Sequence, residues 1–343
     1  MDFTLRQLEL FAALPDHPTL ASAASSLHIS ESALSHAITE LERSVGEQLC
    51  VRRKARGLTL TPAGQFFATR ARQLLQAANE LTSELSNERG QLKGPVEVGC
   101  YTGLATNVLP PVMEGFPTKH PDVTIGVSVG ANDDLLPALH TGQLDVAIVY
   151  DMLLPPGLSH QVIYQTEVMA MLPEHHRLAG EDSIELADLA PEPLIMLEST
   201  PSTANTHRIF REAGLTPNLL AAVPIIELVR ALVGRGLGYS LLMSRPNSIN
   251  ITAEGRGIVA RPLKPRAGKT TVVAVWPEHI TLTPRTQAVV DYAAATMGNM
   301  AQRDLRPEPL IDGANSSRRT EAQRQTSESL PNDGDDFHPE WPD

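Results

Sequence analysis

Apolar residues recur at helical spacing at the start of the chain. Leu5, Leu8 and Phe11 lie three residues apart and predict a first short helix. Pro15 and Pro18 follow within a few residues, and proline cannot continue a helix because it lacks the backbone N–H. The spacing therefore predicts a helix that ends before residue 15.

Two further amphipathic helices are predicted between residues 19 and 46, separated by a three-residue break. Thr19 and Ser30 precede them, and both residue types are favoured as helix N-caps. The apolar positions are Leu20, Ala23, Ala24 and Leu27 in the first helix, and Leu34, Ile38, Leu41 and Val45 in the second. The small alanines allow close approach, so the pattern predicts a helix-turn-helix.

The outer face of the second of these helices is short and polar. On a helical wheel Ser32, Ser35, His36 and Thr39 lie opposite the apolar stripe. A DNA major groove about 12 Å wide admits a helix with such groups, which can bond to base edges. The alternative interpretation is an ordinary solvated face, because helix-turn-helix pairs also occur in proteins that do not bind DNA.

A basic segment follows in residues 51–64, "VRRKARGLTLTPAG". Its cations are Arg52, Arg53, Lys54 and Arg56, and the alternating "LTLT" after them predicts a strand. A β-wing of this kind would bring cations to DNA phosphates or to the minor groove while the helix reads bases. A basic run on a solvated loop is the alternative, but the order helix, turn, helix, basic wing favours DNA binding.

A long helix is predicted from Pro62 to about residue 88. Its apolar positions are spaced alternately four and three residues apart, as in a coiled-coil seam: Phe67, Ala71, Leu74, Ala78, Leu81 and Leu85. The helix could instead lie on its own domain, but no neighbouring stretch offers an obvious apolar partner. We expect it to pair with a second copy, which would bring two reading helices to two half-sites.

From Pro95 onward, strands and helices alternate. Residues 96–100, 123–129 and 146–150 have the composition of buried strands, with helices expected at 104–116 and 135–139. A second set of strands and helices continues to about residue 297. The alternation predicts a parallel sheet flanked by helices, in two α/β lobes joined by crossovers near residues 165 and 265.

Ligands of open α/β sheets gather at the carboxyl ends of strands, where helix N-termini offer free amides. Two such junctions are visible, at residues 100–105 and 197–205. Together with two further strand ends they supply seven candidate ligand-binding residues, each equally able to be a helix cap or loop residue: Tyr101, Thr102, Asn132, Tyr150, Ser199, Thr200 and Ser202. The expected ligand is a small organic anion.

Composition narrows the class of protein. The 343 residues suggest two or three domains, and the net charge of −12 argues against indiscriminate coating of nucleic acid. We expect a cytoplasmic protein, because no segment is typical of a signal peptide or membrane span and the only cysteines are Cys50 and Cys100. Residues 299–343 are acidic, lack apolar periodicity and are expected to be disordered, or alternatively to compete with DNA for the basic patch.

Motifs typical of enzymes are incomplete. "RAGKTT" at 266–271 ends like a phosphate-binding loop, but the earlier glycine of that motif falls on Leu263. His175 and His176 have no partner at metal spacing, and no G-x-S-x-G occurs. We therefore expect no catalytic residues, no metal and no cofactor.

Residues 1–65 resemble the DNA-binding domain of the LysR-type transcriptional regulators. The resemblance rests on the spacing "AA..L..S..ALS..I..LE...G..L" and the closing phrase "LT.AG". It implies a winged helix-turn-helix whose base-facing positions include Glu31, Ser32, Ser35 and His36, with backbone contacts from the arginines at 52, 53 and 56. Family members commonly have Gln in place of Glu31 and often a cation in place of His36, so we expect an operator sequence different from the usual family preference.

The rest of the chain extends the resemblance. Residues 95–297 are similar to the family's effector-binding domain, which has two lobes of periplasmic-binding-protein architecture with the ligand between them. The expected organisation is an all-α winged helix-turn-helix (1–61), a long linker and dimerisation helix (62–90), the two-lobed α/β effector domain (95–297) and the tail (299–343). The implied partners are operator DNA, a small effector, a second copy of the chain and, in an activator, RNA polymerase. Some relatives sense peroxide through paired cysteines in the second lobe, whereas Cys50 and Cys100 flank the linker helix.

Overall fold

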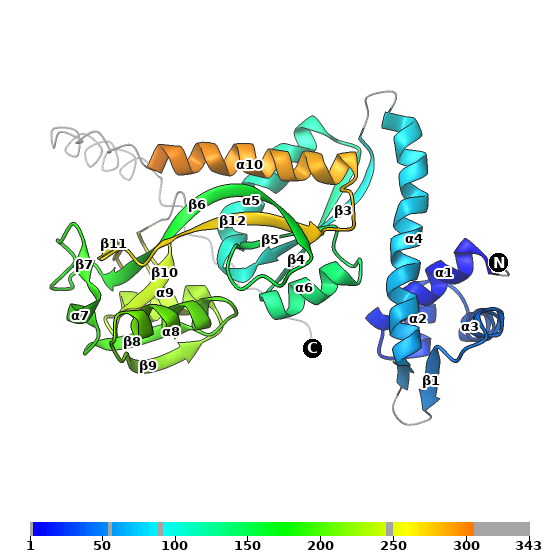
Figure 1. Ribbon diagram of the computed structural model, residues 1–343, viewed down its shortest axis with the longest axis horizontal. Helices are drawn as coiled ribbons and strands as arrows, with labels where there is room; N and C mark the ends of the chain where they lie inside the picture. The colour runs from blue at the N-terminus through cyan, green and yellow to red at the C-terminus, as the bar shows by residue number, and fades with distance from the viewer. Residues whose placement is uncertain (1–2, 54–56, 88–91, 245–249, 305–343) are drawn as a thin grey trace, which may run out of the picture. The chain divides into compact units, whose positions relative to one another are not determined.

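The computed structural model describes residues 3–53, 57–87, 92–244 and 250–304 (Figure 1). The first part is helical apart from one hairpin. Its elements are α1 (Leu5–Ala12), the short 3₁₀ helix η1 (Leu14–Asp16), α2 (Leu20–Ser26), α3 (Glu31–Val45), β1 (Cys50–Arg53), β2 (Gly57–Leu60) and the long helix α4 (Pro62–Asn87). The predicted winged helix-turn-helix and linker helix are both present.

Small residues and caps shape the helix-turn-helix. Ala23 and Ala24 are buried, so α2 packs closely on α3. The hydroxyl of Ser30 accepts a hydrogen bond from the backbone N–H of Ala33 at 3.1 Å and caps α3. Gly46 ends this helix with a φ of 77°, a conformation that only glycine adopts without strain. These local signals define both ends of α3.

The second part alternates strands and helices as predicted. In chain order it contains β3 (Gly94–Tyr101), α5 (Thr102–Lys119), β4 (Val123–Gly130), α6 (Asn132–His140), β5 (Val146–Tyr150), β6 (Leu158–Pro173), β7 (Ile184–Glu185), α7 (Leu186–Leu189), β8 (Pro193–Leu197), α8 (Ser202–Glu212), β9 (Asn218–Val223), α9 (Ile226–Gly234), β10 (Ser240–Met243), β11 (Ile258–Lys264), β12 (Lys269–Pro277) and α10 (Pro284–Asp304).

The main sheet is mixed rather than wholly parallel. Its order is β4-β3-β5-β12-β6-β11-β7, with β10 also paired to β6. Strand β3 runs parallel to β4 and to β5, as the alternation of strands and helices predicted. Strand β12, however, is antiparallel to both β5 and β6. The prediction of a purely parallel sheet was wrong here, because β12 returns from the second lobe and enters the sheet from the opposite end.

One strand belongs to both lobes. The first part of β6 pairs with β12, and its last residues pair with β10 and β11. We call lobe 1 the part built on β3, β4, β5, β12 and the first part of β6, and lobe 2 the part built on β7 to β11 and the rest of β6. The predicted crossovers lie within β6 and in the short turn between β11 and β12.

Separate cores support the lobes. A large buried cluster fills lobe 1 around β3, α5 and α10, and includes Leu104, Phe116 and Val290. Lobe 2 has two smaller clusters, one containing Phe210 of α8 and the other Val229 of α9. Within the described ranges, no helix has the length and apolar character needed to cross a membrane.

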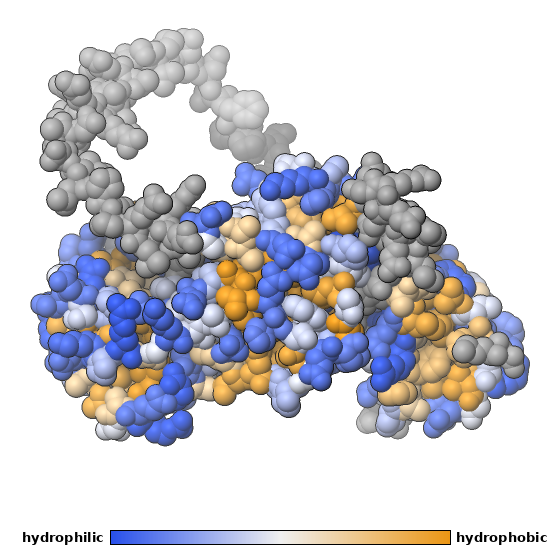
Figure 2. All heavy atoms as spheres, turned by 45° about the horizontal axis from the view of Figure 1, so that its top comes forward, coloured by the Kyte–Doolittle hydropathy of each residue, from blue (hydrophilic) through white to orange (hydrophobic). Residues whose placement is uncertain are grey.

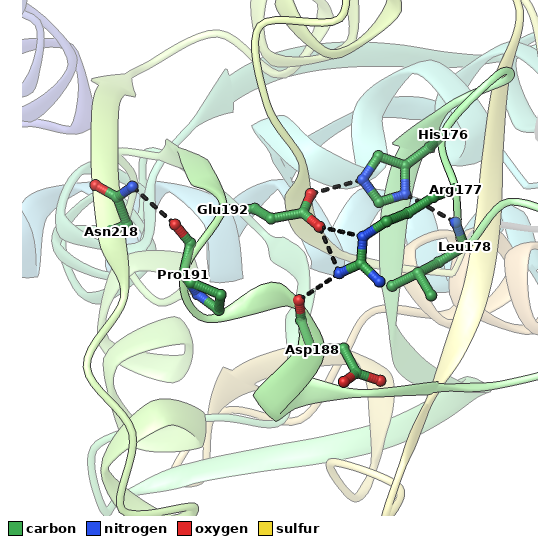
Figure 3. A network of polar contacts seen from close by, with 7 residues as sticks. All are labelled: His176, Arg177, Leu178, Asp188, Pro191, Glu192 and Asn218. Atoms are coloured by element: carbon green, nitrogen blue, oxygen red, sulfur yellow. Dashed lines mark hydrogen bonds and ion pairs between the residues drawn. The ribbon is translucent and has the colours of Figure 1, made fainter.

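A polar network ties the loop after β6 to the start of β8 (Figure 3). The side chain of Glu192 lies 2.6 Å from Nε2 of His176 and accepts hydrogen bonds from Nε and Nη2 of Arg177 at 3.0 and 2.7 Å. Arg177 also donates to the backbone carbonyl of Asp188, and His176 Nδ1 accepts from the N–H of Leu178. The histidine pair noted in the sequence thus has a structural role at His176.

We predict that Glu192→Gln lowers stability at neutral pH but not in acid. Burial raises the pKa of Glu192, but hydrogen bonds from His176 and Arg177 outweigh it and lower the pKa below its ordinary value of 4.5. A lowered carboxyl pKa contributes stability above 4.5 that is lost as the pH falls. Urea unfolding should show a difference at pH values well above 4.5 that shrinks below it, whereas the exposed Glu181→Gln should show none. A difference independent of pH would contradict this assignment.

Candidate functional site

The polar face of α3 is accessible and its apolar face is not. Leu34, Ile38 and Leu41 are buried at 1% exposure or less in the core of the first domain. Glu31 and the polar positions predicted from the helical wheel lie on the opposite side, where Ser32, His36 and Thr39 are exposed and Ser35 is half-buried. The Thr39 hydroxyl donates to the carbonyl of Ser35 at 2.9 Å, so it can present an acceptor outward.

The predicted wing is a β-hairpin. Strands β1 and β2 pair antiparallel from Cys50 opposite Leu60 to Arg53 opposite Gly57. Arg52 and Arg53 lie in β1, next to the turn of the hairpin. Lys54 and Arg56 fall within residues 54–56, outside the described residues. The hairpin immediately follows α3 in the chain, as a wing requires.

The linker helix differs from the expected seam at its first two positions. Phe67 packs edge-to-face on Phe3 and Phe11, with ring centroids 6.1 and 5.6 Å apart, and Ala71 is buried in the same core. Helix α1 thus provides the apolar partner that we did not find in the sequence, and the assignment of Phe67 and Ala71 to pairing between copies is corrected. Leu74, the third predicted position, is 48% exposed, and so is Phe66 at 65%, which the predicted seam did not include.

The later positions of the predicted seam are Ala78, Leu81 and Leu85. Ala78 is half-buried, and the side chains of Leu81 and Leu85 lie outside the described residues. Phe66 has the guanidinium of Arg70 over its ring at 5.5 Å. Among the described side chains, the exposed apolar face of α4 therefore keeps the predicted Leu74 and adds Phe66.

Several of the seven candidate ligand-binding residues meet where the two lobes face each other. The hydroxyl of Tyr101, the last residue of β3, lies 2.8 Å from that of Ser202 at the start of α8. Burial raises the pKa of this phenol, so it stays protonated. Its ring packs against Tyr150 with centroids 5.5 Å apart. The two strand-to-helix junctions recognised in the sequence are thus brought together.

A second contact between the lobes lies beside the first. The backbone N–H of Asn132 donates to the carbonyl of Thr200 at 3.3 Å, and the Thr200 hydroxyl donates to Asp133 at 3.0 Å. Sequence analysis did not single out Asp133. Thr102, at the first position of α5, is half-buried, and no hydrogen bond of its side chain is seen among the described residues.

Asn132 is unusual among these residues. Its side chain is only 3% exposed, yet neither its amide nitrogen nor its oxygen has a hydrogen-bond partner among the described residues. Burying an amide without partners is costly, so such groups in a native fold call for a bound molecule or water. Asn132 also begins α6, but the backbone N–H groups of Asn132, Asp134 and Leu135 already donate to the carbonyls of Thr200 and Ala131.

A cavity of about 580 Å³ lies next to these contacts, beside the strands that join the lobes. It is lined by residues 151–153 after β5, by one side of α8, and by residues 267–270 at the beginning of β12. None of the seven candidate residues is among those lining it, although Pro201 lies between two of them. The cavity was not predicted from the sequence, because its residues come from five separate segments without a shared motif.

Both cysteines of the chain are buried. Burial raises the pKa of the Cys100 thiol strongly, so the reactive thiolate is disfavoured. No group of three potential metal ligands was found among the described residues.

Comparisons with known proteins identify both parts of the chain. Residues 5–65 match the family model described as "Bacterial regulatory helix-turn-helix protein, lysR family", and residues 89–298 match "LysR substrate binding domain". The transcriptional regulator MetR of Salmonella typhimurium is 31% identical, with 74% of this chain and 78% of that protein covered. The crystal structure of HinK, a LysR family regulator from Pseudomonas aeruginosa, is 33% identical with a TM-score of 0.57, covering 87% of this chain and 99% of that one.

The name of a third relative mentions the compound that induces its target genes. It is the "Probable hydrogen peroxide-inducible genes activator" of Mycobacterium leprae, which is 29% identical over 70% of this chain and 77% of its own length. The relatives named here are transcriptional regulators, in agreement with the interpretation that the chain is not an enzyme.

We predict opposite effects for two buried substitutions between the lobes. Tyr101→Phe should lower the free energy of unfolding by about 1 kcal/mol, because it removes the hydrogen bond to Ser202. Asn132→Leu has a similar branched shape and removes no hydrogen bond, so stability should stay equal or rise. Chemical denaturation without ligand measures both. A clear loss of stability in Asn132→Leu would mean that the amide is satisfied in the free protein.

Proposed function

Because this chain belongs to the LysR family of transcriptional regulators, we propose that α3 reads the base edges of an operator under the control of a small organic anion bound between the lobes. The observation that carries the DNA-binding half is the exposed polar face of α3, followed directly by a hairpin with Arg52 and Arg53. Such a protein works where the chromosome is, in the cytoplasm.

In this proposal each surface has a distinct task. Glu31, Ser32, Ser35, His36 and Thr39 contact bases, and the wing arginines at 52, 53 and 56 contact phosphates. Glu31 can only accept hydrogen bonds, for example from a cytosine amino group, and would repel phosphates placed close to it. The operator preference therefore depends on where the first turn of α3 meets the groove.

We place the effector at the junction between the lobes. The buried side-chain amide of Asn132 and the hydroxyls of Ser199, Thr200 and Ser202 provide donors for an anion. A ligand changes the lobe arrangement only if it binds one arrangement better than another. An activator would in addition contact RNA polymerase from its operator-bound state.

We further propose that the chain works as a homo-oligomer. Strand β4 is at one edge of the main sheet and β9 at the edge of the small sheet, and both carry exposed apolar side chains: Val127 and Val129 on β4, and Leu219 and Leu220 on β9. Figure 2 shows apolar residues reaching the surface in several separate patches. Exposed apolar edge strands favour association, and a second copy also fits the exposed Phe66 and Leu74 of α4.

A thiol-based peroxide sensor is the competing function, because of the relative from Mycobacterium leprae. Such a sensor needs an accessible thiol with a low pKa. Cys50 and Cys100 are both buried, and the pKa of Cys100 is raised. The chemistry of these two cysteines favours a non-covalent effector.

Ser35→Glu tests the reading helix. The added carboxylate should repel the DNA backbone and reduce retention of specific genomic fragments by at least tenfold, while the fold is preserved because Ser35 is on the partly exposed face. Ser44→Glu, an exposed position in the last turn of the same helix, is the control. Retention would be measured by sequencing fragments captured by the purified protein, and unchanged retention by Ser35→Glu would refute the assignment.

Leu220→Glu tests the edge strand β9. Leu220 is 54% exposed, so the charge costs little in a monomer but is buried unpaired in an assembly. Light scattering coupled to size exclusion should show a smaller species than the wild type. Ile251→Glu, equally exposed at 55% but outside the edge strands, should not change the mass. An identical mass for Leu220→Glu would exclude β9 from the interface.

A further inference from the structure

One short segment of the N-terminal domain contacts the reading helix, the wing and the linker helix at once. Leu49 and Cys50 lie between α3 and the wing, Cys50 is the first residue of β1, and both are buried. The first turn of α4 begins beside them (Figure 1). We call Leu49 and Cys50, together with Glu42, Thr61 and Gly64, the wing junction.

Glu42 binds this segment from the reading helix. Its Oε1 accepts hydrogen bonds from the backbone N–H groups of Leu49 at 2.8 Å and Cys50 at 3.0 Å. Hydrogen bonds to an ionised carboxylate are about twice as strong as those between neutral groups. Glu42 is in the last turn of α3, where the helix dipole disfavours a negative charge, so its value to the fold lies in these two bonds.

Thr61 binds the same segment from the linker helix. Its backbone N–H donates to the carbonyl of Leu49 at 3.0 Å, and its hydroxyl donates to the carbonyl of Gln48 at 2.9 Å. The hydroxyl also accepts from the N–H of Gly64 at 3.0 Å and thereby caps α4. The linker helix therefore begins on the segment that Glu42 holds.

Gly64 permits this close approach. A Cβ placed on Gly64 would lie 1.8 Å from the carbonyl oxygen of Leu49, so any larger residue would force the two backbones apart. Glycine weakens a helix because its backbone is freer in the unfolded chain. Its presence in the first turn of α4 is explained by contact with the wing junction.

A single peptide group connects the two helices. The peptide between Leu49 and Cys50 donates its N–H to Glu42 of α3, and its carbonyl accepts the N–H of Thr61. The N–H and C=O of a trans peptide point in opposite directions on a rigid plane. Helices α3 and α4 therefore hold this peptide from opposite sides, and a change in the direction of α4 would move the strand that follows it.

We propose that the wing junction sets the position of the wing relative to the reading helix, and that Glu42 and Thr61 are positioning residues for DNA recognition. In the proposed function α3 contacts bases while Arg52 and Arg53 contact phosphates. DNA phosphates have a fixed spacing, so a displaced wing loses its contacts even when α3 can still enter the groove. This effect on DNA binding rests on the proposed function, whereas the hydrogen bonds of the junction do not.

Electrostatics alone predicts the opposite effect of removing Glu42. Loss of a carboxylate near DNA reduces repulsion of the phosphates and should strengthen binding. If Glu42 positions the wing, Glu42→Ala should instead weaken binding by about tenfold or more. Glu47→Ala is the matched control, because it removes the same charge from an exposed position in the same connection between α3 and β1.

The DNA probe is the genomic fragment that the wild-type protein retains most strongly. Its Kd is measured by fluorescence anisotropy over a range of salt concentrations. The slope of log Kd against log salt changes by about 0.9 for each phosphate contact, so loss of the two wing arginines should lower it by about 2. A variant that is only partly unfolded loses active protein but keeps the wild-type slope. Glu42→Gln retains an acceptor oxygen and should restore most of the affinity.

Thr61→Val tests the linker side of the junction, and does so even where Glu42→Ala does not fold. Valine has a similar shape and removes only the hydrogen bonds of the hydroxyl. We expect weaker binding of the fragment and a lower salt slope. Thr69→Val is the control, because the Thr69 hydroxyl donates to the carbonyl of Gln65 at 3.0 Å within α4. Equal behaviour of the two variants would exclude Thr61 as a positioning residue.

Three results would overturn the role of Glu42: binding by Glu42→Ala as tight as by Glu47→Ala, weaker binding with the wild-type salt slope, or Glu42→Gln as weak as Glu42→Ala. Hydrogen exchange of the free protein tests the junction without DNA. Peptides covering residues 48–53 should exchange faster in Glu42→Ala than in Glu47→Ala, and equal exchange would also overturn the proposal. If the wild type retains no fragment, the regulator function is refuted and the exchange measurement still decides the junction.

Discussion

The structure of the C-terminal part depends on one continuous strand that serves two hydrophobic cores. Strand β6 pairs with β12 in lobe 1 and with β10 and β11 in lobe 2, so its hydrogen bonds cannot be rearranged in one lobe without affecting the other. Since β12 returns through a short turn after β11, the lobes are joined by two backbone segments. Two such connections restrict relative motion of the lobes mainly to bending and twisting about them.

Because the lobes can move only about these two connections, the polar contacts between them depend on the angle between the lobes. Tyr101 with Ser202, and Thr200 with Asp133, are hydrogen bonds between groups carried by different lobes. A rotation about the joining strands would break them, and a ligand could replace them with bonds of its own. The unsatisfied amide of Asn132 lies among these groups. A ligand at this junction could therefore replace the hydrogen bonds between the lobes and also supply hydrogen-bond partners to the buried amide of Asn132.

In the N-terminal part, α3 is held in place by its buried apolar face while its polar face stays exposed. Leu34, Ile38 and Leu41 anchor α3 in a core that also contains Phe67 and Ala71 of α4. The linker helix is therefore part of the DNA-binding domain rather than a free arm attached to it. A change in the direction of its first turns would be transmitted to α3 through packed side chains.

Local signals in the sequence were sufficient to predict the helix-turn-helix, the wing, the linker helix and the order of strands and helices. Capping residues such as Ser30, small residues such as Ala23 and the alternation of apolar positions act over a few residues, so they can be recognised without a structure. The positions of Tyr101 and Ser202 at strand-to-helix junctions were predictable for the same reason. Their contact with each other depends on how the two lobes pack, because β3 and β8 belong to different sheets.

Tertiary structure alone decided which apolar face of α4 packs within its own chain. Burial of Phe67 depends on α1, which is some sixty residues away in sequence. Tertiary structure also decided that β12 runs antiparallel, that Asn132 is buried without a partner, and that residues near 152, 208 and 268 line one cavity. Pairing across such distances depends on how the chain packs. Periodicity reports only which side of an element is buried, and not against what.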